Sequence, residues 1–317
     1  MTRLSMYLLG FLCLQLVLAL AIYWQDHQQS TLQQAQPLLS FSRDTLDKII
    51  VIESEKTATL AKDGDHWILP GLDNLVVNQI QLDNALEKLA ALTTDWPIAT
   101  TPTSHQRFEL QEDNFQRRIQ LFQDDNKVAD LLLGSSPGFR KVHLRVLNDN
   151  NVYALPLNTF DFPAEETQWL DKNLLAVTGI TAIQGTDYRL TKKQDEWTLK
   201  SPSSDKLIPI DKDKAMGLVK VLSTLRVVEL ISQPPVFVDA AVKKMVIEGE
   251  QKRHYQLLEL NSHYYIKYQD IDRVFSISQK DYQHITDIDL SGLTADTSET
   301  NTETETNTTS NPVSPSR

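Results

Sequence analysis

Cysteine is almost absent from this chain: the single cysteine among its 317 residues is Cys13, inside an apolar run near the N-terminus. One thiol cannot form an intramolecular disulfide, and thiolate metal sites need several cysteines. Lipidation of Cys13 is disfavoured as well, because the preceding Gly10-Phe11-Leu12 lacks the small residues of a lipoprotein cleavage site. We therefore expect neither a disulfide-stabilised protein nor a thiolate metal centre.

Basic residues are also scarce. Lys and Arg number 31 against 42 Asp and Glu, which gives a formal net charge of -11, whereas binding to nucleic-acid phosphates needs a clustered excess of basic side chains. Short basic pairs stand among acidic or polar neighbours and are interpreted as solvated surface: Arg117-Arg118, Arg140-Lys141, Lys192-Lys193, Lys243-Lys244 and Lys252-Arg253. The phosphate-binding patterns G-x-x-x-x-G-K and G-x-G-x-x-G are missing. We expect no nucleic-acid partner, no nucleotide and no cofactor.

Metal-binding spacings are missing too. The histidines are scattered, without the i, i+4 pair of a helical zinc site or an H-E-x-x-H motif. They are His27, His66, His105, His143, His254, His263 and His284. The acidic triplets at residues 124–126 and 270–272 lack the glycine and distal glutamate of an EF-hand loop, so turns between strands explain them better. We expect no metal site.

One long apolar segment is present near the N-terminus. Residues 4–24 carry no charge and are long enough to cross a bilayer as a helix, and the segment ends on Trp24, a residue type common at membrane interfaces. Arg3 precedes the segment and Asp26 follows it, so the positive-inside rule places the N-terminus in the cytoplasm. We predict a membrane anchor at residues 1–25, single-pass in a bacterial inner membrane, with the C-terminal region periplasmic.

A cleaved signal peptide is the competing interpretation, because Ala19-Leu20-Ala21 fits an A-x-A cleavage site. Cleavage there would leave the bulky Ile22 at the mature N-terminus, and the apolar run is longer than the roughly 7 to 15 residues of a signal core. We favour the retained anchor, followed by a stalk at residues 26–45. At the other end, residues 291–317 are rich in Ser, Thr and Glu and predict a disordered tail.

The remaining sequence contains an internal repeat. The segment KDGDHWIL at residues 62–69 matches KKQDEWTL at residues 192–199, which aligns Trp67 with Trp197. In each segment the tryptophan and the leucine two residues later share one strand face, so we interpret both tryptophans as core residues rather than as a ligand platform.

An amphipathic helical pattern follows each copy of this segment. The two patterns begin at the capping residues Asn78 and Asp211, and they align Leu89 with Leu222. Strand patterns come next: residues starting at Ile119 align with residues starting at Val246, and Tyr153 later aligns with Phe275. The predicted fold is α+β, with two tandem copies of an antiparallel sheet that each carry one packed amphipathic helix. The predicted boundaries are a first repeat at residues 46–157, a connector at 158–178 and a second repeat at 179–290.

Residues 134–138, GSSPG, fit G-x-S-x-G, the pattern of a serine nucleophile in α/β-hydrolases. That motif needs a helix after the second glycine, whereas RKVHLRVL here has a strand pattern. Pro137 also removes a backbone N–H that an oxyanion hole would use. We therefore predict a hairpin loop, with no catalytic role for Ser136.

A short anchor, DGDHWIL with its helix, LLLG followed by HLRVLNDNNVYAL, and WLDKNLL followed by a second copy of the unit occur in this order. With this combination the chain resembles a bacterial family of membrane-anchored domains of unknown function, encoded beside gliding-motility-type ABC transporter genes. The resemblance covers about residues 38–285 and implies an envelope protein that assists an ABC-type transport system. It implies no catalytic residues.

We therefore expect a non-enzymatic, membrane-anchored periplasmic accessory protein, an auxiliary subunit with membrane-protein partners such as ABC transporter subunits. One alternative is an envelope scaffold or assembly protein that works without a transporter. A more remote alternative is a serine hydrolase built on Ser136 and one of the later histidines.

Overall fold

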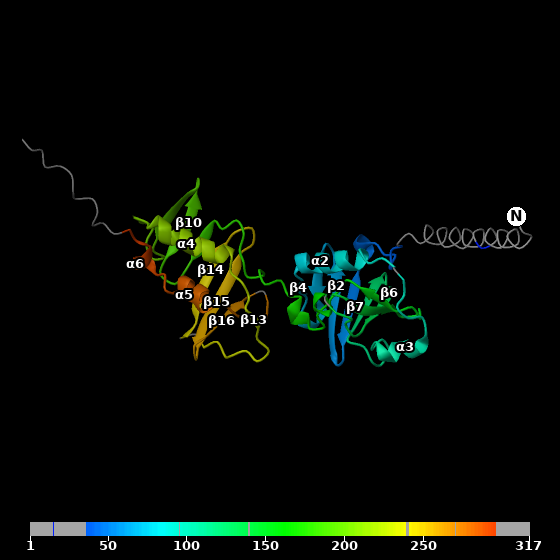
Figure 1. The fold of residues 1–317 in the computed structure, drawn as a ribbon. Helices are drawn as coiled ribbons and strands as arrows, with labels where there is room; N and C mark the ends of the chain where they lie inside the picture. The colour runs from blue at the N-terminus through cyan, green and yellow to red at the C-terminus, as the bar shows by residue number, and fades with distance from the viewer. Residues whose placement is uncertain are drawn as a thin grey trace, which may run out of the picture. The chain divides into compact units, whose positions relative to one another are not determined.

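The computed structural model describes residues 36–295 apart from residues 95, 139, 239–240 and 270, and also residue 15. The chain forms two compact units that divide between Asp171 and Lys172 (Figure 1). The predicted anchor apart from residue 15, most of the predicted stalk and the tail beyond residue 295 lie outside the described residues. Among the helices that are described, none is long and apolar enough to cross a membrane.

An eight-stranded antiparallel sheet forms the centre of the first unit, in the order β4-β3-β2-β1-β5-β6-β7-β8. Its strands are β1 (Lys48–Glu53), β2 (Lys56–Asp63), β3 (His66–Leu69), β4 (Leu75–Val76), β5 (Arg117–Gln123), β6 (Asn126–Leu133), β7 (Val142–Val146) and β8 (Tyr153–Leu155). Short 3-10 turns, η1 (Arg43–Thr45) and η2 (Pro70–Leu72), lie before β1 and after β3. One face of the sheet is apolar, because alternate residues such as Ile49 and Val51 are fully buried.

The second unit has a nine-stranded sheet in the order β12-β11-β10-β9-β14-β15-β16-β17-β13. Its strands are β9 (Ala182–Gln184), β10 (Arg189–Lys193), β11 (Glu196–Lys200), β12 (Leu207–Ile208), β13 (Glu229–Leu230), β14 (Lys243–Glu248), β15 (Arg253–Leu260), β16 (His263–Tyr268) and β17 (Val274–Ser276). Without the edge strand β13, the strand order repeats that of the first sheet element by element. The predicted arrangement of two mostly antiparallel sheets with few helices is confirmed.

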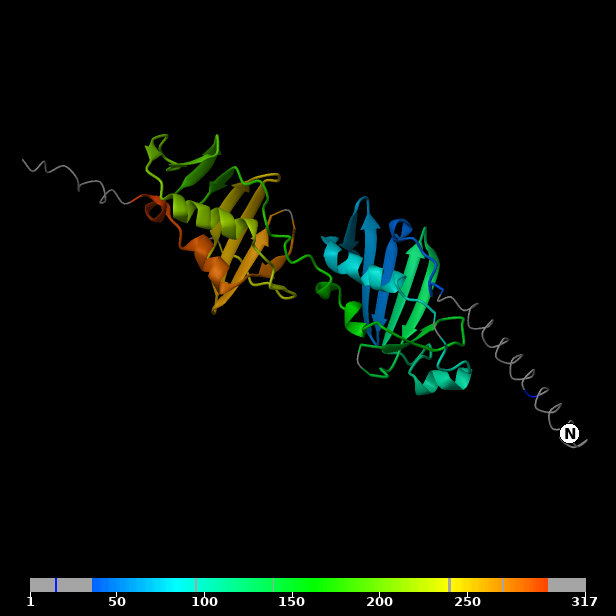
Figure 2. The same cartoon turned by 45° about the horizontal axis from the view of Figure 1, so that its top comes forward.

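One amphipathic helix lies across one face of each sheet (Figures 1 and 2). The helices are α2 (Gln79–Ala90) and α4 (Lys212–Ser223), and each buries one apolar stripe that includes Leu89 or Leu222. Both begin at the predicted caps: the Asn78 side chain accepts a hydrogen bond from the backbone N–H of Gln81, and Asp211 accepts one from that of Lys214. A capped helix with a single apolar stripe is stable only when that stripe is covered, which the sheet does here.

Each unit is closed by the segment that follows its last meander strand. In the first unit this segment contains η3 (Thr159–Asp161) and η4 (Glu166–Gln168), and in the second it contains α5 (Gln279–Thr286) and α6 (Leu290–Leu293). The Asn78 N–H donates to the Trp169 carbonyl at 2.7 Å, and the Asp211 N–H donates to the Leu293 carbonyl at 2.8 Å. Both segments therefore return to the residue that caps the unit's helix.

The predicted connector at residues 158–178 is thus divided between the units. Residues 158–171 close the first unit, and Lys172 opens the second, where its carbonyl accepts a hydrogen bond from the Val227 N–H at 2.8 Å. Gln36 has the same role in the first unit, because its carbonyl accepts from the Thr94 N–H at 2.7 Å. The sequence pattern of a short helical connector could not reveal these pairings, since their partners lie far along the chain.

Strand register corrects the sequence alignment of the two units by one residue in β5 and β14. The sequence aligns Ile119 with Val246, but Ile119 and Leu121 face the core of the first unit, and Met245 and Ile247 face the core of the second. Val246 is only partly buried. Because side chains alternate along a strand, an alignment displaced by one residue places every side chain on the wrong face.

The second face of the sheet is covered differently in the two units. In the first unit, a segment with α3 (Pro102–Arg107) folds over β6 to β8, where Leu110, Leu132 and Val152 form a buried cluster. In the second unit, the corresponding stretch between helix and β14 contains β13 and residues 231–238, which carry exposed apolar side chains. The sequence did not predict α3, α5 or α6.

Candidate functional site

The GSSPG segment at residues 134–138 is the loop between β6 and β7, as the sequence predicts. The Ser136 hydroxyl lies 2.9 Å from the Gly138 carbonyl and 2.7 Å from the Lys141 carbonyl, and it can donate to either. Strand β7 follows the loop where a nucleophile elbow would have a helix. The Ser136 hydroxyl is therefore used to hold the turn.

The backbone requires glycine at both glycine positions of the pattern, Gly134 and Gly138. A Cβ on Gly134 would lie 1.9 Å from the carbonyl oxygen of Phe108 and 2.6 Å from that of Glu109. Gly138 has φ of 145°, a conformation that other residues rarely adopt. The match to G-x-S-x-G thus follows from a close approach of two chain segments and a tight turn.

A serine and a histidine do meet beside this loop, but the serine is Ser135. Its Oγ lies 3.0 Å from Nδ1 of His143 and 3.3 Å from the Phe108 carbonyl, and the Phe108 ring packs on the imidazole with centroids 4.4 Å apart. Burial lowers the pKa of His143, as does the nearby charge of Arg107, and these outweigh the opposing hydrogen bond of Ser135. The imidazole is therefore neutral near pH 7. Ser135, His143 and Phe108 together join the hairpin of β6 and β7 to the segment that contains α3, which we call the covering segment.

The outer face of β5 and β6 carries a nearly buried carboxylate, Asp130, of which only 7% is exposed. Arg118 donates to both carboxylate oxygens at 2.8 Å, Gln120 donates at 3.0 Å, and Lys127 donates at 2.5 Å. Burial raises the pKa of Asp130, but these three donors outweigh burial and hold the pKa below its ordinary value. The carboxylate is thus fully used within the unit, which makes it a structural ion pair.

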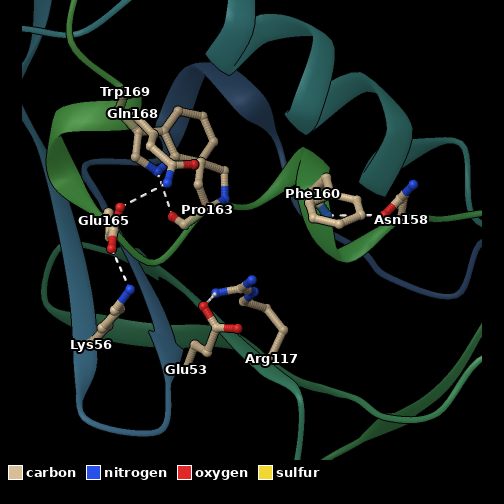
Figure 3. A network of polar contacts seen from close by, with 9 residues as sticks. All are labelled: Glu53, Lys56, Arg117, Asn158, Phe160, Pro163, Glu165, Gln168 and Trp169. Atoms are coloured by element: carbon tan, nitrogen blue, oxygen red, sulfur yellow. Dashed lines mark hydrogen bonds and ion pairs between the residues drawn. The ribbon is translucent and has the colours of Figure 1, made fainter. Parts of the chain in front are cut away.

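The interpretation of the basic pair Arg117-Arg118 as solvated surface is wrong, because both side chains form ion pairs within the unit. Arg117 is 6% exposed and donates to Glu53 at 2.7 Å (Figure 3). The two arginines project from opposite faces of β5 and each meets a carboxylate, a pairing that the local sequence does not show.

The closing segment of the first unit is tied to the hairpin of β1 and β2 by a polar network (Figure 3). Glu165 forms an ion pair with Lys56 and accepts a hydrogen bond from Gln168. Trp169 is fully buried, and its indole N–H donates to the Pro163 carbonyl at 2.8 Å. These contacts fix residues 163–169 in place, so the network stabilises the unit.

Within the described residues, no group of three or more His, Cys, Asp or Glu side chains is placed to hold a metal ion. Asp124 and Asp125 have φ of 48° and 61° and form the two-residue turn between β5 and β6, which is the left-handed turn that suits such hairpins. Asp272 forms an ion pair with Lys267 at 2.8 Å between β16 and β17.

The two aligned tryptophans differ in burial. Trp67 is 6% exposed and belongs to the core, as expected. Trp197 is only partly buried, although it pairs with Lys192 across the strands in the same way as Trp67 pairs with Lys62. The expectation of a core position is therefore met by the first tryptophan and not fully by the second.

An exposed apolar segment in the second unit was missed by the sequence patterns. We define residues 231–238, ISQPPVFV, as the apolar loop. Val236 is 82% exposed and Val238 is 59% exposed. The loop borders a hollow lined by Pro235, Phe237 and residues of β15 to β17. The sequence did contain one signal for this loop. Its apolar residues surround two prolines and follow neither the period of a strand nor that of a helix.

The described units define an α+β protein with two antiparallel sheets of the same strand order, each covered on one face by an amphipathic helix. Residues 67–245 match the family model described as Domain of unknown function (DUF4340), and the chain belongs to this family. The match begins in β3 of the first unit and ends in β14 of the second. The chain has no match among curated proteins and none among solved structures.

Proposed function

We propose that this chain is a non-enzymatic accessory protein of an ABC-type transport system, anchored in the inner membrane by residues 4–24 with both units in the periplasm. In this proposal the two units are copies of one α+β module that arose by tandem duplication, and the protein acts by binding membrane-protein partners.

The single observation that best supports a binding role is the unequal covering of two otherwise corresponding units. In the first unit, Leu110 of the segment with α3 packs in one cluster with Val152, and both have 0% exposure. The second unit instead presents Val236 and Val238 in the apolar loop. Clustered apolar side chains on the surface of a soluble domain are typical of protein–protein contacts. The resemblance in sequence pattern to a family found beside ABC transporter genes supports the choice of partner.

Co-purification of the intact chain from membranes tests the proposal. The tagged full-length protein is extracted in a mild detergent, and the recovered proteins are quantified by mass spectrometry. We expect the ATPase and permease subunits of an ABC transporter. The double variant Val236→Asp/Val238→Asp should reduce their recovery by about tenfold, because two carboxylates would be desolvated in the contact. Ile80→Asp is the matched control, since Ile80 is 75% exposed on α2 of the other unit.

Two outcomes contradict this proposal. Recovery of envelope assembly proteins without transporter subunits supports the scaffold alternative. Equal loss of partners in the Ile80→Asp control shows that the apolar loop is not the contact surface.

The membrane topology has its own test. A reporter enzyme that works only outside the cytoplasm should be active when it is fused after residue 40. The mature chain should begin near residue 1. A mature N-terminus at Ile22 would overturn the anchor, because residues 4–21 would then be a removed signal peptide.

A further inference from the structure

A groove lies on the outer face of the second sheet, over β9 to β11. In β10, Leu190 is fully buried in the core. Arg189, Thr191 and Lys193 alternate with it along the strand, so they project from the opposite face and line the groove. Hydroxyl groups of threonine and serine residues in β11 and the following loop also line the groove, together with Lys200 and the exposed carboxylate of Asp205. We call this feature the cationic groove.

The charges of the cationic groove are poorly compensated within the chain. Arg189 stands directly opposite Lys200 in the pairing of β10 with β11, and like charges at such positions destabilise a sheet. Lys200 forms an ion pair with Asp205 at 3.1 Å, but Asp205 is fully exposed, and surface pairs of this kind contribute little. Among the described residues, the side chains of Arg189 and Lys193 have no hydrogen-bond or ion-pair partner, although Glu196 stands opposite Lys193 in the register.

The corresponding face of the first sheet is built differently. The tryptophan of each unit pairs with a lysine across the strands, which aligns β2 and β3 with β10 and β11. In this alignment Thr59 stands where the second unit has Arg189, and Asp63 stands where it has Lys193. Glu166 of the closing segment lies beside β2 and accepts a hydrogen bond from the Thr59 N–H at 3.2 Å. The exposed cations are therefore a feature of the second unit and not of the shared architecture.

We propose that the cationic groove binds a phosphate-bearing ligand. A phosphate monoester carries close to two negative charges and three free acceptor oxygens, and a phosphodiester carries one charge and two such oxygens. Either group can accept from donors on two neighbouring strands at once. Arg189 supplies a planar fork of N–H donors, Lys193 supplies an ammonium group, and the threonine and serine hydroxyls supply further donors. The phosphate also relieves the repulsion between Arg189 and Lys200.

The same chemistry can come from a soluble phosphate ester or from an anionic lipid headgroup. The lining of the groove includes no aromatic side chain, so it offers no stacking surface for a nucleobase. Recognition rests on the phosphate and on ligand hydroxyls that the threonines and serines can bind. The experiment distinguishes the two sources.

Binding is measured on the full chain in micelles of a neutral detergent, at constant ionic strength. One arm titrates inorganic phosphate and glycerol 3-phosphate by calorimetry. The other arm adds phosphatidylglycerol to the micelles, with phosphatidylcholine as the neutral comparison, and follows the melting temperature. The test variant is Arg189→Gln/Lys193→Gln. The control is Lys192→Gln, because Lys192 is the chain neighbour of Lys193 but projects from the opposite face, where it pairs with Asp195 at 2.8 Å.

We expect binding in at least one arm, and this arm identifies the source of the phosphate. The double variant should lose about tenfold or more in affinity, whereas Lys192→Gln should stay within about twofold of the parent chain. Equal weakening in both variants shows only general attraction to positive charge and overturns the proposal. Absence of binding in both arms overturns it as well. Failure of transporter subunits to co-purify leaves these results unaffected, because the proposed site lies wholly within the second unit.

Discussion

Replacement of Gly134 by alanine tests how the hairpin loop of the first unit is held. The added Cβ would lie 1.9 Å from the Phe108 carbonyl oxygen and 2.6 Å from that of Glu109. Ordinary contacts between carbon and a carbonyl oxygen are about 3.3 Å or longer, so the loop and the covering segment must separate by more than about 1 Å. Both nearby oxygens belong to the backbone, so no flexible side chain can move aside.

This separation disrupts the hydrogen bond from the Ser135 N–H to the Phe108 carbonyl, which is 3.0 Å long. Loss of a partner for a partly buried donor costs about 1–2 kcal/mol. Phe108 also packs against the cluster of Leu110, Leu132 and Val152, and strain of this kind in a packed region costs roughly 1–3 kcal/mol. We expect Gly134→Ala to lower the free energy of unfolding of the first unit by about 2–5 kcal/mol.

Hydrogen–deuterium exchange across a urea series, read by mass spectrometry, assigns the change to one unit. The matched control is Gly217→Ala in α4, because a Cβ on Gly217 meets no atom within 4 Å. Alanine is the better helix former by about 1 kcal/mol, so the second unit should become slightly more stable. A first unit that stays within about 0.5 kcal/mol of the parent after Gly134→Ala refutes the close approach described above.

Three further predictions concern the core, the loop serine and pH. Leu89→Ala and Leu222→Ala should each destabilise their own unit by about 2–5 kcal/mol, measured by the same exchange method, since both side chains have 0% exposure; an effect on the other unit would contradict this assignment. Ser136→Ala should cost about 0.5–1 kcal/mol through its turn hydrogen bonds and leave partner recovery unchanged, and labelling of Ser136 by a serine-reactive probe would instead support a hydrolase. Folding lowers the pKa of His143, so the unfolded chain takes up the proton first on acidification. The stability of the first unit should therefore fall as the pH drops below about 6.5, and His143→Gln should remove this part of the urea-midpoint shift.

Local signals in the sequence determined the two longest described helices and several turns of this protein. Asn78 and Asp211 cap the two amphipathic helices, as their side-chain chemistry and the apolar spacing predict. The turn at Asp124 and Asp125 and the hairpin loop around Ser136 were also predictable. These features depend on a few neighbouring residues, so the order of residues along the chain carries enough information to specify them.

Alignment of the two halves also predicted part of the long-range order. The sequence pairs Tyr153 with Phe275, and in the sheets these residues stand opposite Leu144 and Ile266 in corresponding strands. The same alignment is displaced by one residue at Ile119. It pairs Ile119 with Val246 although Met245 faces the core, because isoleucine is as similar in hydrophobicity to valine as to methionine. Hydrophobic similarity alone does not fix register, whereas the hydrogen-bonded ladder does.

Only the tertiary structure decided which side chains share a face. Lys192 and Lys193 are neighbours in sequence and were interpreted together, but the strand places them on opposite faces, and only Lys193 joins Arg189 in the cationic groove. Ser135 meets His143 because of the hairpin register, and residues 158–171 close the first unit through backbone pairs with residues before α2. Each of these contacts joins residues on separate strands or segments, and strand pairing and burial set their geometry, which no local pattern specifies.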